Sequence, residues 1–177
     1  FGGTNTTGRV NMGFGRIEWN PGSSLVETCG DASKNVFNVW GGNCTENPTT
    51  FGGKPTGMLS VNGTLYSWVN TQNAAFPGVD FALAWSTDLG ATWQKSSWVF
   101  PAGTNAFKPQ AFLSFGRDYA GARDSYIYIY GIPQGSLGAV QDIYLARVPA
   151  ASLQDKTAYQ YYTGLDTTSN PTWSSDI

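Results

Sequence analysis

The stretch KPTGMLS at residues 54–60 decides the fold, because the related stretch KPQAFLS at residues 108–114 follows it 54 positions later. Lysine, proline, leucine and serine occupy the same places in both stretches. Short runs rich in aromatic and β-branched residues follow each of them, which is typical of β-strands. Helical periodicity is nearly absent, so the repeat predicts an all-β unit that occurs at least twice.

The first unit carries signals for four antiparallel strands. Its opening run leads into Asn62-Gly63, which is a strong signal for a two-residue hairpin turn. The apolar and aromatic residues at 65–69 form the second strand of this hairpin. Residues 81–100 then supply a third strand, a turn and a fourth strand. Strands in this order predict a meander sheet.

The second unit has the same order of signals. Its later strands are predicted at residues 126–131, 142–150 and 158–165, with a short helical turn at 149–159. Residues 8–20 resemble the third strand of an earlier unit. We therefore divide the chain into the end of one blade (1–50), two fuller blades (51–104 and 105–169) and the start of another (170–177). Four-stranded units that repeat after about 50 residues predict a partial β-propeller, and the alternative is a β-sandwich.

The turn STDLGATW at residues 86–93 resembles the Asp-box of sialidase-like propellers. Asp88 can accept hydrogen bonds from backbone N–H groups across the turn, and Ser86 offers a further local bond. Gly90 can take a positive φ without steric cost, and Trp93 can pack over the turn. In that family the motif joins strands three and four at the outer rim, away from substrate. We therefore predict a structural role for Asp88 rather than a catalytic one.

The position of Asp88 orients each blade. The Asn62-Gly63 turn and the loop 116–124 then share its side, and we interpret this loop as an ion-paired structural element. Propellers usually bind ligands on the opposite side, around the central channel. The candidate substrate-binding or catalytic residues on that side are Lys54, Asn70, Gln72, Asn73, Asp80, Lys108, Gln110, Gln134, Asp142 and Trp173.

The composition excludes several classes of function. Charged residues make up 12% of the chain and the net charge is −2, without a basic cluster that could follow a phosphate backbone. No apolar run approaches the roughly 20 residues of a membrane-spanning helix. Histidine is absent, which excludes Ser-His-Asp triads, Cys-His pairs and histidine metal sites.

Other features predict a secreted protein. Cys29 and Cys44 are expected to form a disulfide, with two free thiols as the alternative. Asn5, Asn43 and Asn62 each begin an Asn-x-Thr sequon, so they are candidate glycosylation sites. The opening Phe-Gly-Gly predicts a processed or partial chain.

Several longer stretches together resemble a family of secreted five-bladed β-propellers, long catalogued as a domain of unknown function, with members linked to arabinan-cleaving glycoside hydrolases. The stretches are KPTGMLSVNGTLYSWVN (54–70), LAWSTDLGATW (83–93), FLSFGRDYAGARDSYIYIYG (112–131), YLARVPAASLQDKTAYQYYTGLD (144–166) and PTWSSDI (171–177). The resemblance covers most of residues 51–177 and is less clear over residues 1–50. Five such blades need about 270 residues, so it implies that much of the propeller lies outside this chain.

The resemblance implies a polysaccharide-directed activity, such as endo-acting hydrolysis of an arabinan. This chemistry needs two carboxylates about 5 to 9.5 Å apart, one protonated and one ionised. The acids of the family lie largely in the missing first blades, and Asp80 and Asp142 are the best-placed acids here. No cofactor is expected. The sequence does not decide whether calcium occupies the central channel.

The expected partners are a glycan and either the remainder of the propeller or another subunit, which would cover the open sheet edges. The alternative function is a non-catalytic extracellular module. Such a module would bind glycan or assemble with other chains.

Overall fold

The structure is a computed structural model, and it describes residues 54–71, 80–88, 90, 92–101, 107–133 and 142–176 together with two short strands. These two strands, β1 (Ile17–Glu18) and β2 (Val26–Glu27), pair in antiparallel fashion. Apart from short 3₁₀ turns, the regular structure of the described residues is antiparallel β-sheet, which confirms the predicted all-β class. Among these residues, no helix has the length and apolar character needed to cross a membrane.

The first sheet is a meander that follows the predicted order. Its strands are β3 (Lys54–Val61), β4 (Thr64–Thr71), β5 (Asp80–Ser86) and β6 (Gln94–Lys95). Asn62 and Gly63 form the turn between β3 and β4 with φ values of 49° and 75°. Asparagine and glycine tolerate this left-handed conformation, which matches the right-handed twist of the flanking strands.

The second sheet repeats this order and adds a fifth strand. Its strands are β7 (Lys108–Phe112), β8 (Tyr126–Ile132), β9 (Tyr144–Pro149), β10 (Gln160–Leu165) and β11 (Pro171–Ser174). The short 3₁₀ turn η1 (Arg117–Tyr119) follows β7. The helical turn expected before the fourth strand is present as η2 (Ala150–Ser152) and η3 (Lys156–Ala158).

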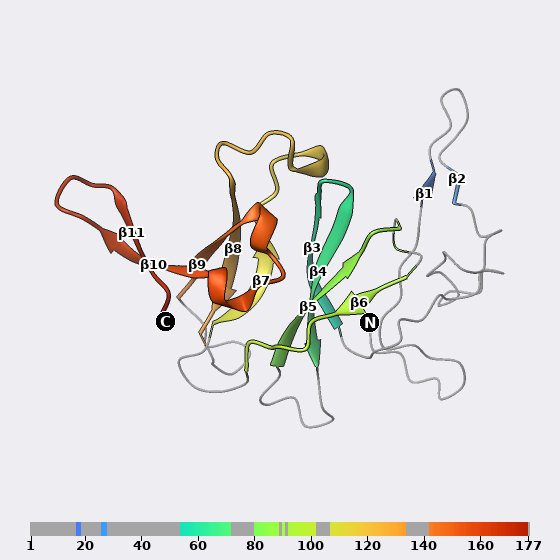
Figure 1. Ribbon diagram of the computed structural model, residues 1–177, viewed down its shortest axis with the longest axis horizontal. Coiled ribbons are helices and arrows are strands. Elements are labelled where there is room, and N and C mark those ends of the chain that lie inside the picture. Colours follow the sequence, from blue (N-terminus) through green and yellow to red (C-terminus); the bar gives the residue numbers. More distant parts are fainter. Residues whose placement is uncertain are drawn as a thin grey trace.

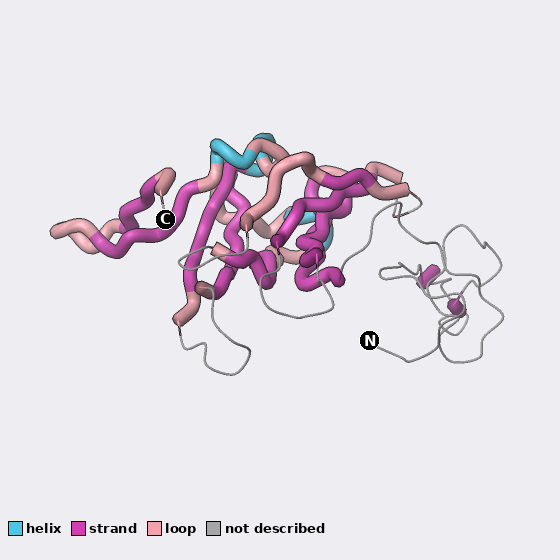
Figure 2. The backbone as a smooth tube through the Cα atoms, turned by 90° about the horizontal axis from the view of Figure 1, so that it is seen from below, coloured by secondary structure: helices cyan, strands magenta, loops and turns pink. Residues whose placement is uncertain are grey.

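Strand β11 lies where the sequence did not place it. Residues 170–177 were expected to open a further sheet, but β11 pairs with β10 as the edge strand of the second sheet. The turn explains this pairing, because the Asp166 carboxylate accepts hydrogen bonds from the backbone N–H groups of Thr168 (2.8 Å) and Asn170 (2.9 Å). The resulting β10–β11 hairpin projects away from the other strands of the second sheet (Figures 1 and 2).

The sequence repeat is also a structural repeat. The β3–β4 ladder shifts register at Thr56, directly after Pro55, and the β7–β8 ladder shifts register at Gln110, directly after Pro109. A proline cannot donate to the ladder, so a bulge beside it is a common solution. The same irregularity therefore occurs at equivalent residues of the two units.

The two sheets approach each other most closely through their first strands (Figure 1). The Thr56 hydroxyl donates to the carbonyl oxygen of Pro109 at 3.4 Å. A Cβ atom on Gly57 would lie only 3.0 Å from the Cα atom of Ala111, so glycine permits the close contact between the backbones of β3 and β7.

Aromatic side chains fill the space between the sheets. Trp68 of β4 is fully buried and stacks on Phe112 of β7 with ring centroids 5.4 Å apart. The rings of Phe100 and Tyr159 meet Trp68 edge-on at 5.6 and 6.2 Å. These residues belong to one hydrophobic cluster with members from both sheets, so the sheets pack face to face.

The segment 149–159 connects the outer parts of the two sheets. The Trp98 indole N–H donates to the carbonyl oxygen of Gln154 at 2.8 Å. The Lys156 ammonium donates to the carbonyl oxygen of Val99 at 2.6 Å. These contacts fix the second sheet to the chain that follows β6.

Candidate functional site

The end of the sheets at which β3 and β7 begin, here called the strand-start end, carries most of the predicted ligand-binding residues. Lys54 opens β3 opposite Asn70, and Lys108 opens β7 opposite Ile132. Only the backbone of Lys54 is described. Gln72, Asn73 and Gln134 lie outside the described residues, as do Asn5, Asn43 and both cysteines.

Asn70 is a buried polar residue at this end, with 9% of its surface exposed. Its side-chain oxygen Oδ1 is buried and has no hydrogen-bond partner within the described structure. The same holds for the indole Nε1 of Trp68, which lies two residues away on the same face of β4. Buried polar atoms are normally paired, so an unpaired acceptor at the end of a sheet is a candidate contact for a ligand.

Lys108 and Gln110 add a cation and an amide. Lys108 is only 7% exposed, although lysine is one of the residues least often buried. The Gln110 side-chain amide donates to the carbonyl oxygen of Lys108 at 3.3 Å, which turns it back toward the strand start. Together with Asn70 these residues offer both donors and acceptors, the chemistry that sugar hydroxyls require.

The two candidate acids lie in different sheets. Asp80 opens β5 and pairs with Thr71 in the first sheet, whereas Asp142 is exposed and precedes β9 of the second sheet. An acid–base pair made of these two carboxylates would have to act across the space between the sheets. The described residues contain no group of three or more acidic or cysteine side chains suited to a metal ion.

Trp173 of β11 packs against an arginine of the second sheet. Its ring is 4.1 Å from the guanidinium carbon of Arg147, and the ring of Tyr126 covers the same carbon at 4.2 Å. The Arg147 Nε donates to the Gln160 side chain at 2.9 Å. Trp173 therefore takes part in a cation–π stack beside the middle of β8 and β9.

The turn at residues 86–93 uses its acid internally. The Asp88 carboxylate accepts hydrogen bonds from the Thr92 backbone N–H (2.8 Å), the Thr92 hydroxyl (2.7 Å) and the Ser86 hydroxyl (2.8 Å). Gly90, at a φ of 88°, donates its N–H to the Ser86 oxygen, and the Trp93 indole donates to the Gly90 carbonyl. These bonds are the ones expected of an acid that holds a turn.

The same bonds predict a dependence of stability on pH. Hydrogen bonds from the Thr92 side chain, the Thr92 backbone and Ser86 lower the pKa of Asp88 from its usual 3.8 to about 2. As the pH falls, Asp88 is therefore protonated in the unfolded chain before it is protonated in the folded chain. The stabilisation by its carboxylate is complete above about pH 4 and is lost as the pH falls to about 2. Thermal unfolding across this range should show a steeper fall of the midpoint for the wild type than for Asp88→Asn. Parallel curves would contradict the role of the carboxylate.

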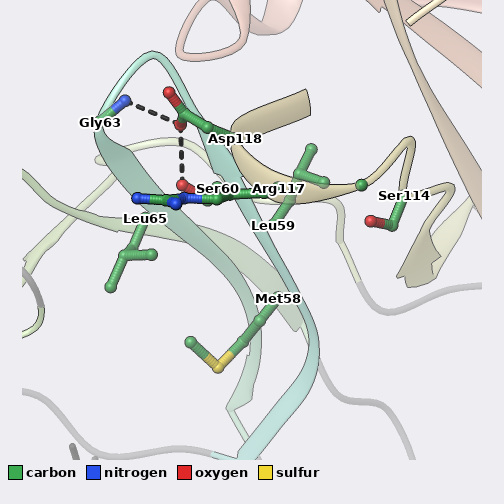
Figure 3. A pocket seen from close by; sticks show the side chains of 9 residues that line it. Met58, Leu59, Ser60, Gly63, Leu65, Ser114, Arg117 and Asp118 are labelled. Carbon is green, nitrogen blue, oxygen red and sulfur yellow. Dashed lines mark hydrogen bonds between the residues drawn. The ribbon is translucent and has the colours of Figure 1, made fainter. Parts of the chain in front are cut away.

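A groove of about 500 Å³ lies at the opposite end from the strand starts, between the β3–β4 hairpin and the chain that follows β7 (Figure 3). It is lined by Met58, Leu59, Ser60, Gly63, Leu65, Ser114, Gly116, Arg117 and Asp118. Asp118 of η1 accepts hydrogen bonds from the backbone N–H of Gly63 (2.9 Å) and the hydroxyl of Ser60 (2.8 Å), which lower its pKa. Asp118 thus connects the second sheet to the first hairpin.

The loop 116–124 was expected to be ion-paired, but neutral groups make the hydrogen bonds of its carboxylates. Ser60 and Gly63 donate to Asp118, and the backbone N–H of Tyr126 donates to Asp124 at 2.9 Å. The loop therefore contributes a structural connection, as predicted, through different partners.

Comparison with known families identifies the chain. The model of a family described as a domain of unknown function (DUF4185) matches residues 17–177. The chain belongs to the DUF4185 family. This confirms the part of the sequence resemblance that pointed to a family catalogued as a domain of unknown function. A search of curated proteins found no match.

Two features of this DUF4185 domain were missed at the level of sequence. The repeat places Asp118 in the loop that corresponds to the Asn62-Gly63 turn, but it does not indicate that this loop and this turn touch. The Arg147 stack had no signal in the sequence, because it depends on the register that brings the rings of both Tyr126 and Trp173 to one guanidinium group.

Proposed function

We propose that the two sheets are adjacent blades of a β-propeller, of the five-bladed type that the resemblance implies. The shared strand order, the equivalent bulges at Thr56 and Gln110, and the neighbouring positions of β3 and β7 support this proposal. In a propeller the first strands of successive blades surround a common axis. The remainder of the propeller, or another subunit, would cover the outer faces of the two blades.

We further propose that the domain is a secreted, carbohydrate-active module that binds a polysaccharide such as an arabinan at the strand-start end. The observation that carries this proposal is the buried, unpaired Oδ1 of Asn70. A sugar hydroxyl can donate to this oxygen, and another hydroxyl of the polymer can accept from the Lys108 ammonium. A polymer with many hydroxyl groups suits a site that has both an unfilled acceptor and a buried cation.

Glycoside hydrolysis is the activity that the resemblance favours, with Asp80 and Asp142 as the candidate acids. A second candidate is a non-catalytic glycan-binding module, in which the other described carboxylates with shifted pKa values have structural roles. Hydrogen bonds within turns or to a neighbouring turn lower the pKa values of Asp88, Asp118, Asp155 and Asp166. A general acid at neutral pH needs a raised pKa, so none of these four carboxylates fits that role.

Asn70→Ala is expected to weaken binding of arabinan oligosaccharides about tenfold, because the sugar loses one hydrogen bond. The free energy of unfolding of the unbound protein should stay the same or rise, since the variant no longer buries an unpaired oxygen. Calorimetric titration measures the binding and urea denaturation measures the stability. The matched control is Asp166→Asn in the β10–β11 turn, which should leave binding unchanged.

Assays of oligosaccharide binding and release by the same protein distinguish the two candidate functions. Release of oligosaccharides by the wild type, lost in Asp80→Asn or Asp142→Asn, supports a hydrolase. Binding without release supports the non-catalytic module. If the wild type binds neither arabinan nor any polysaccharide of a broad panel, both proposals fail.

A further inference from the structure

The Asn62–Gly63 turn between β3 and β4 contains a chemically reactive peptide link. Both residues are exposed to solvent. Glycine has no Cβ atom, so its backbone nitrogen can approach the side-chain amide of the preceding asparagine with little hindrance. An asparagine followed by glycine is for this reason prone to deamidation, and asparagine is among the thermolabile residues of proteins.

The nitrogen that would react is engaged in a hydrogen bond. The N–H of Gly63 donates to Oδ1 of Asp118 at 2.9 Å, and the hydroxyl of Ser60 donates to the same oxygen at 2.8 Å. Asp118 comes from η1 of the second unit, so this contact bridges the two sheets (Figure 3). The side chain of Asn62 makes no contact of this kind within the described structure.

We propose that Asn62 is a deamidation site and that Asp118 suppresses the reaction by holding the N–H of Gly63. In the reaction the Gly63 nitrogen loses its proton and bonds to Cγ of Asn62, while the Cγ–Nδ2 bond breaks and ammonia leaves with a proton. Water then opens the resulting ring at either carbonyl and gives aspartate or isoaspartate. An adjacent carboxylate opposes the first step, because negative charge would develop beside negative charge.

The reaction would also weaken the contact that prevents it. Either product places a second carboxylate in the turn beside Asp118, and like charges at short range repel. Isoaspartate also lengthens the backbone of a two-residue turn, whose length sets the register of β3 against β4. Deamidation at Asn62 would therefore loosen the bridge between the sheets.

The test uses the full chain produced without glycosylation, because Asn62 also begins a sequon. Deamidation at Asn62 is followed by peptide mass spectrometry during incubation at mildly alkaline pH. Asp118→Ala should deamidate at least about fivefold faster than the wild type, the effect of losing one hydrogen bond to a carboxylate. Asp118→Asn keeps an acceptor oxygen without the charge and should fall between them. Asp166→Asn removes a turn carboxylate elsewhere and should match the wild type.

Hydrogen exchange at the Gly63 amide gives a second measurement, and it should be faster in Asp118→Ala. Circular dichroism establishes that each variant is folded, and if Asp118→Ala is not, Asp118→Asn against the wild type decides the result. Equal rates of deamidation in the wild type and the folded Asp118 variants would overturn the proposal. A wild-type rate equal to that of a free peptide spanning residues 58–66 would overturn it as well.

Discussion

Trp68→Ala is expected to lower the free energy of unfolding by about 3–5 kcal/mol, the largest effect we predict. Trp68 is fully buried and its indole stacks on Phe112 across the space between the sheets. Phe100 and Tyr159 surround it edge-on, so alanine would leave a cavity lined by large rings that cannot collapse into it. The indole N–H has no hydrogen-bond partner within the described structure, so the loss comes from packing.

Urea denaturation measures this effect, with Met58→Ala as the control. Met58 lies on β3 but is 50% exposed, so its truncation should cost less than about 1 kcal/mol. If Trp68→Ala also cost less than about 1 kcal/mol, the face-to-face packing of the two sheets would be contradicted.

Gly131→Ala is expected to destabilise the protein by about 1–3 kcal/mol through overpacking. A Cβ atom on Gly131 of β8 would lie 2.6 Å from Cζ of Phe107. The Phe107 ring is buried and meets Phe100 and Tyr161 edge-on, with centroids 5.6 and 5.4 Å apart, so it has little room to move. The added methyl group must therefore displace the ring or bend β8.

A double-mutant cycle with Phe107→Leu tests the cause. The smaller leucine should make room for the methyl group, so the double variant should be more stable than the sum of the single effects predicts, by about 0.5–3 kcal/mol. Additive effects would show that Gly131 is required for some reason other than contact with Phe107.

The first sheet was predictable because its signals are local. Asn62-Gly63 specifies a two-residue hairpin, and β4 and β5 are short, largely apolar runs that are typical of strands buried on both faces. The position of β11 was not predictable from its own residues, because a short run such as Pro171–Ser174 does not specify its partner strand. The turn bonds of Asp166 make that choice, and they act through backbone geometry.

The candidate site was predictable to the extent that it follows from the repeat. Strand order brings Lys108 and Gln110 to the start of β7, and the hairpin register brings Asn70 opposite the start of β3. The Asp118 bridge was not predictable, because it joins residues 55 positions apart through one carboxylate oxygen. Such a contact depends on how two separately folded units pack against each other.

The segment 149–159 also has a mechanical consequence. Gln154 and Lys156 of this segment bind the chain that follows β6 of the first sheet, while Asp118, elsewhere in the second unit, binds the β3–β4 hairpin of the first sheet. Two sheets that are connected at well-separated points cannot easily rotate relative to each other. The two described sheets are therefore expected to behave as one rigid unit.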